Sequence, residues 1–216
     1  MTAPGHPAEA RGAGPGSARR LRDVVAPRPR LLLVGINPGL RSGAIGHHFA
    51  GAGNPFWRLL HAARLTPRLL TYAEDQSLAA LGISLTNLCP RTTRTAAELT
   101  AAEEEQGRRV LARKIARWRP AVVAFVGVSL YRVFFGVSGG PGPGAKRETV
   151  AGARVFVVPN PSGLNASFPG FADKLRWYQA LRRFVDRINA GDRGKGKRDL
   201  PRAAAVASVG RGRAAP

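Results

Sequence analysis

Residues 31–39 read LLLVGINPG, a continuous apolar run from Leu31 to Ile36 that stops at the turn-forming residues Asn-Pro-Gly. An apolar run without polar alternation is typical of a strand that is buried on both faces. AVVAFVGV at 121–128 and RVFVVP at 154–159 share this pattern, and ISLT at 83–86 is a shorter example. Four such strands predict an α/β protein, a three-layer α/β/α fold with a central, mostly parallel four-stranded sheet.

The segments between these strands have the periodicity of amphipathic helices. Asn-Pro at 54–55 is typical of a helix start, and the apolar residues that follow recur on one face. Thr100 and Glu103 form a capping-box pattern for a second helix, and a third is predicted over about 171–189. Residues 136–147 are rich in glycine and proline, which predicts a surface loop.

The chain is strongly basic, with 34 Lys and Arg against 13 Asp and Glu and a net charge of +21. Residues 1–27 and 190–216 contain few bulky apolar side chains, so we expect a disordered basic arm and a disordered basic tail around a domain at 28–189. Most of the excess charge lies between these tails. A basic domain indicates a polyanionic partner such as nucleic acid. An arginine-rich composition that reflects genomic base bias is the alternative.

Several classes of protein are excluded by what the sequence lacks. The single Cys89 rules out a disulfide framework and a multi-cysteine zinc site. No apolar run approaches the roughly 20 residues of a membrane helix, and the common nucleotide-binding glycine motifs are absent. His47 and His48 have no neighbouring acidic or cysteine residue to complete a metal site. We therefore expect a soluble, cytoplasmic monomer, nucleoid-associated if bacterial, without metal or cofactor.

Two segments follow strands, where ligands bind in open parallel sheets. The first is GINPG at 35–39, followed by GHHFAGAGNPFW at 46–57, and the second is NPSGL at 160–164. The carboxamide of Asn37 can hold a water molecule or read a heterocycle edge, although Asn-Pro-Gly is also an ordinary tight turn. Leu164 on a loop of a basic protein can act as a wedge that enters a base stack.

Together these motifs resemble the uracil-DNA glycosylase superfamily, and in particular its branch of mismatch-specific uracil and thymine DNA glycosylases, over residues 29–188. The resemblance implies a monofunctional enzyme of base excision repair. Such an enzyme binds double-stranded DNA, flips a mismatched or damaged base out of the helix and hydrolyses its N-glycosidic bond.

The resemblance also implies roles for individual residues. Asn37 takes the position of the residue that orients the attacking water, and Phe49 that of the aromatic ring that stacks on the flipped base. The backbone of Ile36 lines the pocket, and Asn87 stands where thymine-directed members contact the base. Asn160 stands where more active relatives carry a histidine that steadies the departing base.

The expected DNA contacts come from a second set of residues. The insertion loop that fills the gap in the duplex corresponds to Ser162, Gly163, Leu164 and Asn165. An arginine that many relatives carry just after this motif is missing here. We also expect His48 to contact DNA or the pocket rim. Arg91 and Arg94 follow the second strand, and they either meet phosphates or have a solvated surface role.

The resemblance also places two residues near the base, where they bear on which base is accepted. Gly39 has no side chain that would exclude a methyl group on the base, whereas the hydroxyl of Ser42 disfavours one. We therefore expect uracil opposite guanine to be preferred, with thymine and etheno-cytosine as weaker substrates. A glycosylase for deaminated purines and a non-catalytic module that binds mismatched or single-stranded DNA remain alternatives.

Overall fold

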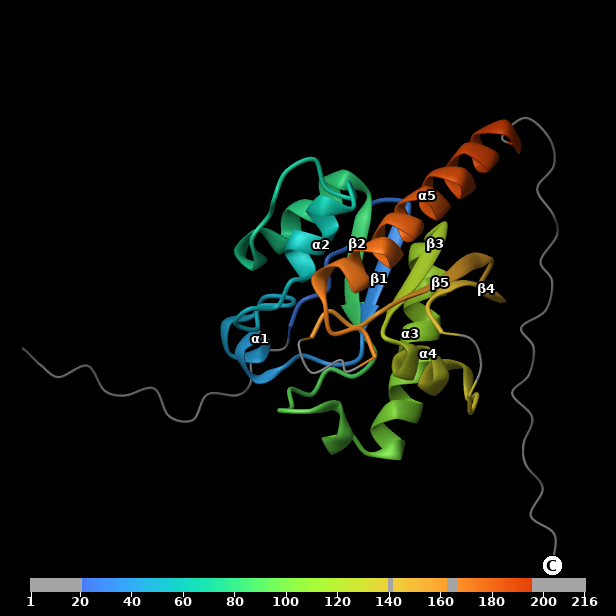
Figure 1. Ribbon diagram of the computed structural model, residues 1–216. Helices are drawn as coiled ribbons and strands as arrows, with labels where there is room; N and C mark the ends of the chain where they lie inside the picture. The colour runs from blue at the N-terminus through green and yellow to red at the C-terminus, as the bar shows by residue number, and fades with distance from the viewer. Residues whose placement is uncertain (1–20, 140–141, 163–166, 196–216) are drawn as a thin grey trace, which may run out of the picture.

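The computed structural model describes residues 21–139, 142–162 and 167–195, which form a sheet with helices on both faces (Figure 1). The strand order is β2-β1-β3-β5-β4, and all pairs are parallel except β4 with β5. The strands are β1 (Leu31–Gly35), β2 (Ile83–Asn87), β3 (Val122–Val126), β4 (Gly144–Val150) and β5 (Ala153–Val158). The three-layer α/β/α prediction is confirmed, but the sheet has five strands instead of four.

The additional strand is β4, part of which lies in the predicted loop 136–147. Its sequence GAKRETV is polar, and Lys146 is the one buried residue along it. It pairs antiparallel with β5 through a tight turn at Ala151 and Gly152, which have φ angles of 49° and 84°. An edge strand is paired on one side only, so it does not need the apolar run that identified the inner strands.

Alternate residues of the strands enter two separate cores. Leu31 and Leu33 pack with the helices of one face, whereas Leu32 and Val34 pack with those of the other. The first face carries α2 (Phe56–Ala62), the 3-10 helix η1 (Tyr72–Leu81) and α5 (Phe171–Lys195), and the second carries α3 (Ala101–Trp118) and α4 (Val128–Phe135). Coverage of both faces explains why these strands are apolar throughout.

The structure agrees with two of the predicted helix starts and extends a third helix. Thr100 caps α3 by accepting a hydrogen bond from the Glu103 N–H, which confirms the capping box. Asn54 accepts a hydrogen bond from the Phe56 N–H at the start of α2. The helix α5 continues to Lys195, beyond the predicted end at residue 189. Two short elements, α1 (Leu40–Ile45) and η2 (Ala96–Glu98), complete the fold.

The packed domain begins before residue 28. Val24 is buried and pairs antiparallel with Leu85 through two backbone hydrogen bonds of 3.0 and 2.9 Å. The Asp23 carboxylate accepts from the Thr86 hydroxyl at 2.6 Å and pairs with Lys114 at 2.7 Å. Residues 21–27 therefore cover the open edge of β2 and are not part of a free arm. Residues 1–20 and 196–216 lie outside the described residues.

Candidate active site

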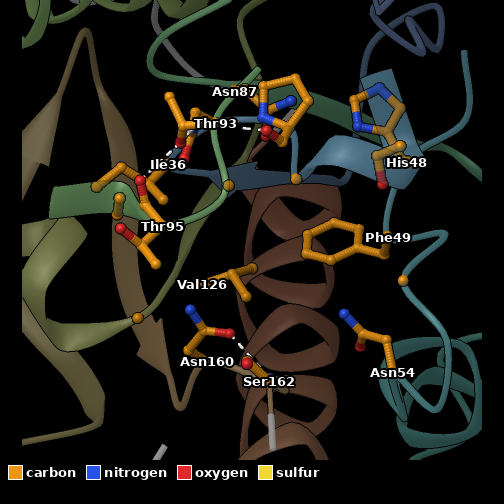
Figure 2. A pocket seen from close by; sticks show the side chains of 18 of the residues that line it. Ile36, His48, Phe49, Asn54, Asn87, Thr93, Thr95, Val126, Asn160 and Ser162 are labelled. Carbon is orange, nitrogen blue, oxygen red and sulfur yellow. Dashed lines mark hydrogen bonds between the residues drawn. The ribbon is translucent and has the colours of Figure 1, made fainter. Parts of the chain in front are cut away.

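The carboxyl ends of β1, β2, β3 and β5 meet at a cavity of about 580 Å³. In the view of Figure 2, Phe49 and Asn54 lie on one side of this cavity and Thr93 and Thr95 on the other. The predicted site residues that line it are Ile36, Asn37, Gly39, Ser42, His48, Phe49, Asn87, Asn160 and Ser162. Gly163, Leu164 and Asn165 lie outside the described residues.

The Asn37 side chain is held by a network of hydrogen-bond acceptors. Its Nδ2 donates to Thr93 Oγ1 at 2.6 Å, to the Arg91 carbonyl at 3.0 Å and to the Pro38 carbonyl at 3.3 Å. The Thr93 hydroxyl donates to the Thr95 carbonyl at 2.7 Å, so its oxygen acts as an acceptor toward Asn37. Because all three partners are acceptors, the atom of the Asn37 amide that faces them is the NH₂ nitrogen. The amide oxygen lies on the opposite side of the amide group, where it can accept a hydrogen bond.

Phe49 forms an aromatic wall of the cavity. Its ring stacks on Phe56 with centroids 3.7 Å apart and an interplanar angle of 14°. One face of the Phe49 ring is therefore covered by protein, while the residue as a whole remains partly exposed at the cavity. Such a ring provides a flat apolar surface on which a heterocyclic base can stack.

The backbone of Phe49 is left-handed, with φ of 51°, and its neighbours on both sides are anchored. The buried Asp75 accepts a hydrogen bond from the His48 N–H at 3.0 Å, and its other oxygen lies 3.3 Å from His47 Nδ1. Ser42 Oγ accepts from the Ala50 N–H at 3.0 Å. A left-handed conformation costs a non-glycine residue about 1–2 kcal/mol, and these bonds offset that cost.

His48 contributes to the wall of the cavity. Its side chain is buried, and Nε2 lies 3.0 Å from the Arg22 carbonyl. Burial lowers the pKa of His48, so the ring is neutral near pH 7 and donates from Nε2 to that carbonyl. The buried ring thus joins the 46–50 loop to residue 22 beside the cavity, and contact between His48 and DNA stays a prediction.

We expect acid to destabilise the protein through His48. Because burial lowers its folded-state pKa, the unfolded chain takes up a proton at a pH where the folded chain does not. The stability present above the ordinary histidine pKa of about 6.5 is then lost as the pH falls. Urea unfolding at pH 7.5 and 5.5 should show this loss, and His48→Gln should reduce it. An unchanged pH dependence in His48→Gln would exclude this residue as the cause.

Gly35, at the end of β1, makes room for two site residues. A Cβ at position 35 would lie 2.4 Å from Asn87 Oδ1 and 3.6 Å from Phe49 Cζ. The first distance is far below van der Waals contact, so only glycine lets the Asn87 amide lie against the β1 backbone. Asn87 at the end of β2 is thereby brought to the same wall as Phe49.

The opposite wall is built from Asn160 and the start of α4. Asn160 Oδ1 accepts from the Ser162 N–H at 2.9 Å, so the other polar group of this side chain is its NH₂ donor (Figure 2). Gly127, Val128 and Ser129 also line the cavity. The first N–H groups of a helix have no intrahelical partner and create a positive potential. This wall suits a group that acquires negative charge.

Arg94 and Arg41 are the exposed cations that line this cavity. Arg91 lies outside it, and its guanidinium binds the Glu103 carboxylate with contacts of 2.5 and 3.0 Å. The hydrogen bond from Arg91 helps to lower the pKa of Glu103 to about 2, so this pair persists near neutral pH. Contact between Arg91 and DNA stays a prediction, whereas Arg94 is better placed at the cavity.

The described residues that line the cavity include no Cys, Lys, Asp or Glu. Cys89 is buried elsewhere, and burial raises the pKa of its thiol to about 11, so it is protonated at neutral pH. Within residues 21–139, 142–162 and 167–195, no group of three or more His, Cys, Asp or Glu could hold a metal ion. The same ranges contain no helix long and apolar enough to cross a membrane.

Comparison with known proteins agrees with this geometry. The family model of the uracil DNA glycosylase superfamily matches residues 22–182, which is most of the chain. The chain belongs to the uracil DNA glycosylase superfamily. A solution structure from Methanosarcina acetivorans, named as a candidate uracil DNA glycosylase, is similar with 17% identity and a TM-score of 0.52. The match covers 78% of this chain and 98% of that one, and it supports the fold.

Membership of the superfamily makes this protein a DNA glycosylase, a hydrolase of base excision repair that acts on DNA. Sequence reasoning missed two residues that organise the site of this glycosylase. Thr93 belongs to no recognised motif, and its position shortly after β2 was the one feature of the sequence that could have indicated a place in the site. Asp75 lies in a 3-10 helix whose sequence gives no sign of a buried carboxylate.

Proposed function

We propose that this glycosylase is a monofunctional, monomeric enzyme that removes uracil mispaired with guanine from double-stranded DNA. Thymine and etheno-cytosine opposite guanine are weaker substrates. The observation that carries this proposal is the oriented carboxamide of Asn37 in a cavity with a stacking ring and hydrogen-bond donors. None of the described residues that line the cavity is a lysine, which favours water as the nucleophile.

Asn37 positions the attacking water. Its amide oxygen accepts a hydrogen bond from that water and thereby directs a lone pair at the sugar carbon that holds the base. A carboxamide cannot remove a proton as a strong base does, so it accelerates the reaction by placement. The reaction then depends strongly on how well the base leaves.

The flipped base lies between Phe49 and the Asn160 wall. Stacking on the Phe49 ring contributes about 1–3 kcal/mol, and Asn87 contacts the edge of the base. As the glycosidic bond breaks, negative charge develops on the base. The NH₂ group of Asn160 and the amino end of α4 stabilise this charge.

The preference for uracil follows from two positions near the base. Ser42 is buried, and the bond from the Ala50 N–H holds it in place, so it cannot turn away from a methyl group. Gly39 is open, with no atom within 4 Å of the position of a Cβ. Thymine therefore fits the cavity but meets a polar side chain. Mispaired bases also flip more easily because their pairing is already weakened.

Thr93→Ala should slow base release by about tenfold, which corresponds to loss of one hydrogen bond of about 1–1.5 kcal/mol. The substitution removes the shortest of the three contacts of Asn37 Nδ2. Thr93→Ser keeps the hydroxyl and should restore most of the rate. Single-turnover kinetics at saturating enzyme measures this effect without a contribution from DNA binding. A serine variant as slow as the alanine variant would contradict the role of the hydroxyl.

Gly39→Tyr should lower thymine release at least about tenfold more than uracil release, since a methyl clash of 1–3 kcal/mol gives this range. The space around Gly39 admits a large side chain, which would narrow the cavity. The measurement is the ratio of single-turnover rates on G·U and G·T duplexes. Gly39→Ala serves as the control and should leave the ratio close to that of the natural chain. Equal losses on both substrates would show that residue 39 does not face the methyl group.

A substrate panel tests the proposed function directly. Duplexes with one uracil, thymine, hypoxanthine or etheno-cytosine opposite guanine are incubated with the protein and then treated with alkali. We expect strand cleavage only after alkali, fastest for uracil, with free base in solution. Faster release of hypoxanthine would favour the deaminated-purine glycosylase. Tight mismatch binding without any abasic site would favour the non-catalytic binding module.

A further inference from the structure

A second cavity, of about 590 Å³, lies at the amino ends of the parallel strands. It is lined by residues just before β1 and β3, by the β4–β5 turn and the start of β5, and by the last part of α5. The candidate active site lies at the carboxyl ends of the same strands, so the sheet separates the two cavities. Figure 1 shows α5 running along the sheet and beyond it on the side away from α1.

The charged residues that the structure describes in the lining of this cavity are all arginines. We call it the arginine hollow, because four of its lining residues are Arg28, Arg119, Arg154 and Arg187, and none of its described lining residues is acidic. All four arginines are exposed, and no ion pair joins any of them to an acidic residue in the described part of the chain. The Arg187 guanidinium lies over the Phe184 ring at 5.6 Å.

An arginine-rich composition does not by itself produce this arrangement. Elsewhere, several acidic residues pair with arginines, as in Arg68 with Glu74 and Arg108 and Arg109 with Glu105. Asp186, next to Arg187 in sequence, is paired with Arg182. These carboxylates thus pair with arginines outside the arginine hollow, and none of the described residues that line the hollow carries a compensating negative charge.

Two of these arginines have a backbone conformation that glycine would adopt with less strain. Arg28 and Arg119 both have φ of 52°, and Arg119 ends α3 at a position that glycine usually takes. A non-glycine residue in this conformation costs about 1–2 kcal/mol. At these two positions the chain therefore has an arginine at the hollow, although a glycine would give a more stable backbone.

We propose that the arginine hollow binds the phosphate backbone of a second nucleic-acid segment, separate from the duplex whose base enters the active site. A guanidinium has a planar set of donors that matches phosphate oxygens, and four of them around an open hollow suit a repeating polyanion. We choose nucleic acid as the polyanion because the protein acts on DNA. This choice of ligand is the only part of the inference that rests on the proposed function. The protein would then bridge two segments.

The test is a bridging measurement with the full chain. An immobilised G·U duplex made resistant to cleavage is saturated with protein, and capture of a second, labelled duplex without a mismatch is measured. The hollow variant combines R28Q, R119Q, R154Q and R187Q. The control combines R64Q, R113Q, R147Q and R183Q, which removes the same charge from exposed positions outside the hollow.

We expect the natural chain and the control variant to capture the second duplex, and the hollow variant to lose capture at least tenfold. Circular dichroism and uracil release within twofold of the natural rate show that the hollow variant is folded. The salt dependence of capture should also fall in the hollow variant, by up to about 0.9 in slope for each lost phosphate contact.

Equal loss of capture in both variants would overturn the proposal, since general charge would then explain it. No capture by the natural chain, or capture of an acidic peptide in place of the duplex, would also overturn it. Capture does not require base excision, because the first duplex resists cleavage. A protein that bridges duplexes but releases no base would therefore contradict the proposed function and leave this inference intact.

Discussion

Replacing Asn37 with alanine should lower the rate of uracil release from a G·U duplex by at least about 10²–10³, the range for loss of a positioned polar group at a reacting centre. The side chain that holds the water would be gone, while the stacking ring and the donors of the opposite wall remain. DNA affinity should therefore change little. Single-turnover kinetics measures the rate, and fluorescence anisotropy with the same duplex measures the affinity.

Gln179→Ala is the matched control for Asn37→Ala, because it removes an exposed carboxamide on α5 that lines neither the candidate active site nor the arginine hollow. This control should retain the natural rate. If Asn37→Ala also kept most of its rate, the water would be held by another group. If affinity fell as much as the rate, Asn37 would act in DNA binding and not in placing the nucleophile.

Replacing Asp75 with alanine should reduce both stability and base release. The His48 N–H would lose its buried acceptor, which costs about 1–3 kcal/mol in the free energy of unfolding. The left-handed Phe49 next to it would no longer be anchored on that side, so we expect base release to fall at least tenfold. Urea unfolding measures the first effect, and single-turnover kinetics measures the second.

Asp75→Asn separates the hydrogen bond from the charge of this side chain. An asparagine oxygen can still accept from the His48 N–H, so this variant should keep most of the stability and rate. A fluorescent base analogue placed beside the uracil reports base flipping and stacking. Below the unfolding temperature, a variant that is only less stable would give the same fluorescence signal as the natural chain. Normal flipping in a folded Asp75→Ala variant would refute the positioning role.

The inner strands of the fold could be predicted because burial on both faces demands apolar residues at every position. Leu31–Gly35 satisfies this rule, with alternate side chains in the two cores. The strand β4 could not be predicted in this way, since an edge strand tolerates polar residues. Val24 was likewise missed, because the short run Val24–Ala26 in an arginine-rich segment carries no periodicity.

The candidate site was predictable to the extent that it depends on strand ends. Asn37, Asn87 and Asn160 lie at the ends of three different strands, and a parallel sheet brings such residues to one edge. The partners that orient them were not predictable. Thr93 is 56 residues from Asn37, and Asp75 is 27 residues from His48, so their contacts depend on how the loops pack.

The amino-acid sequence by itself determined the layered fold and the set of side chains at the carboxyl ends of the strands, because apolar runs and turn residues act locally. The tertiary structure alone decided how these side chains are oriented and which polar groups are buried. It also decided that four arginines from distant segments share one hollow at the opposite end of the sheet. Hydrogen bonds and charge clusters depend on distance in space, and only the packed chain sets that distance.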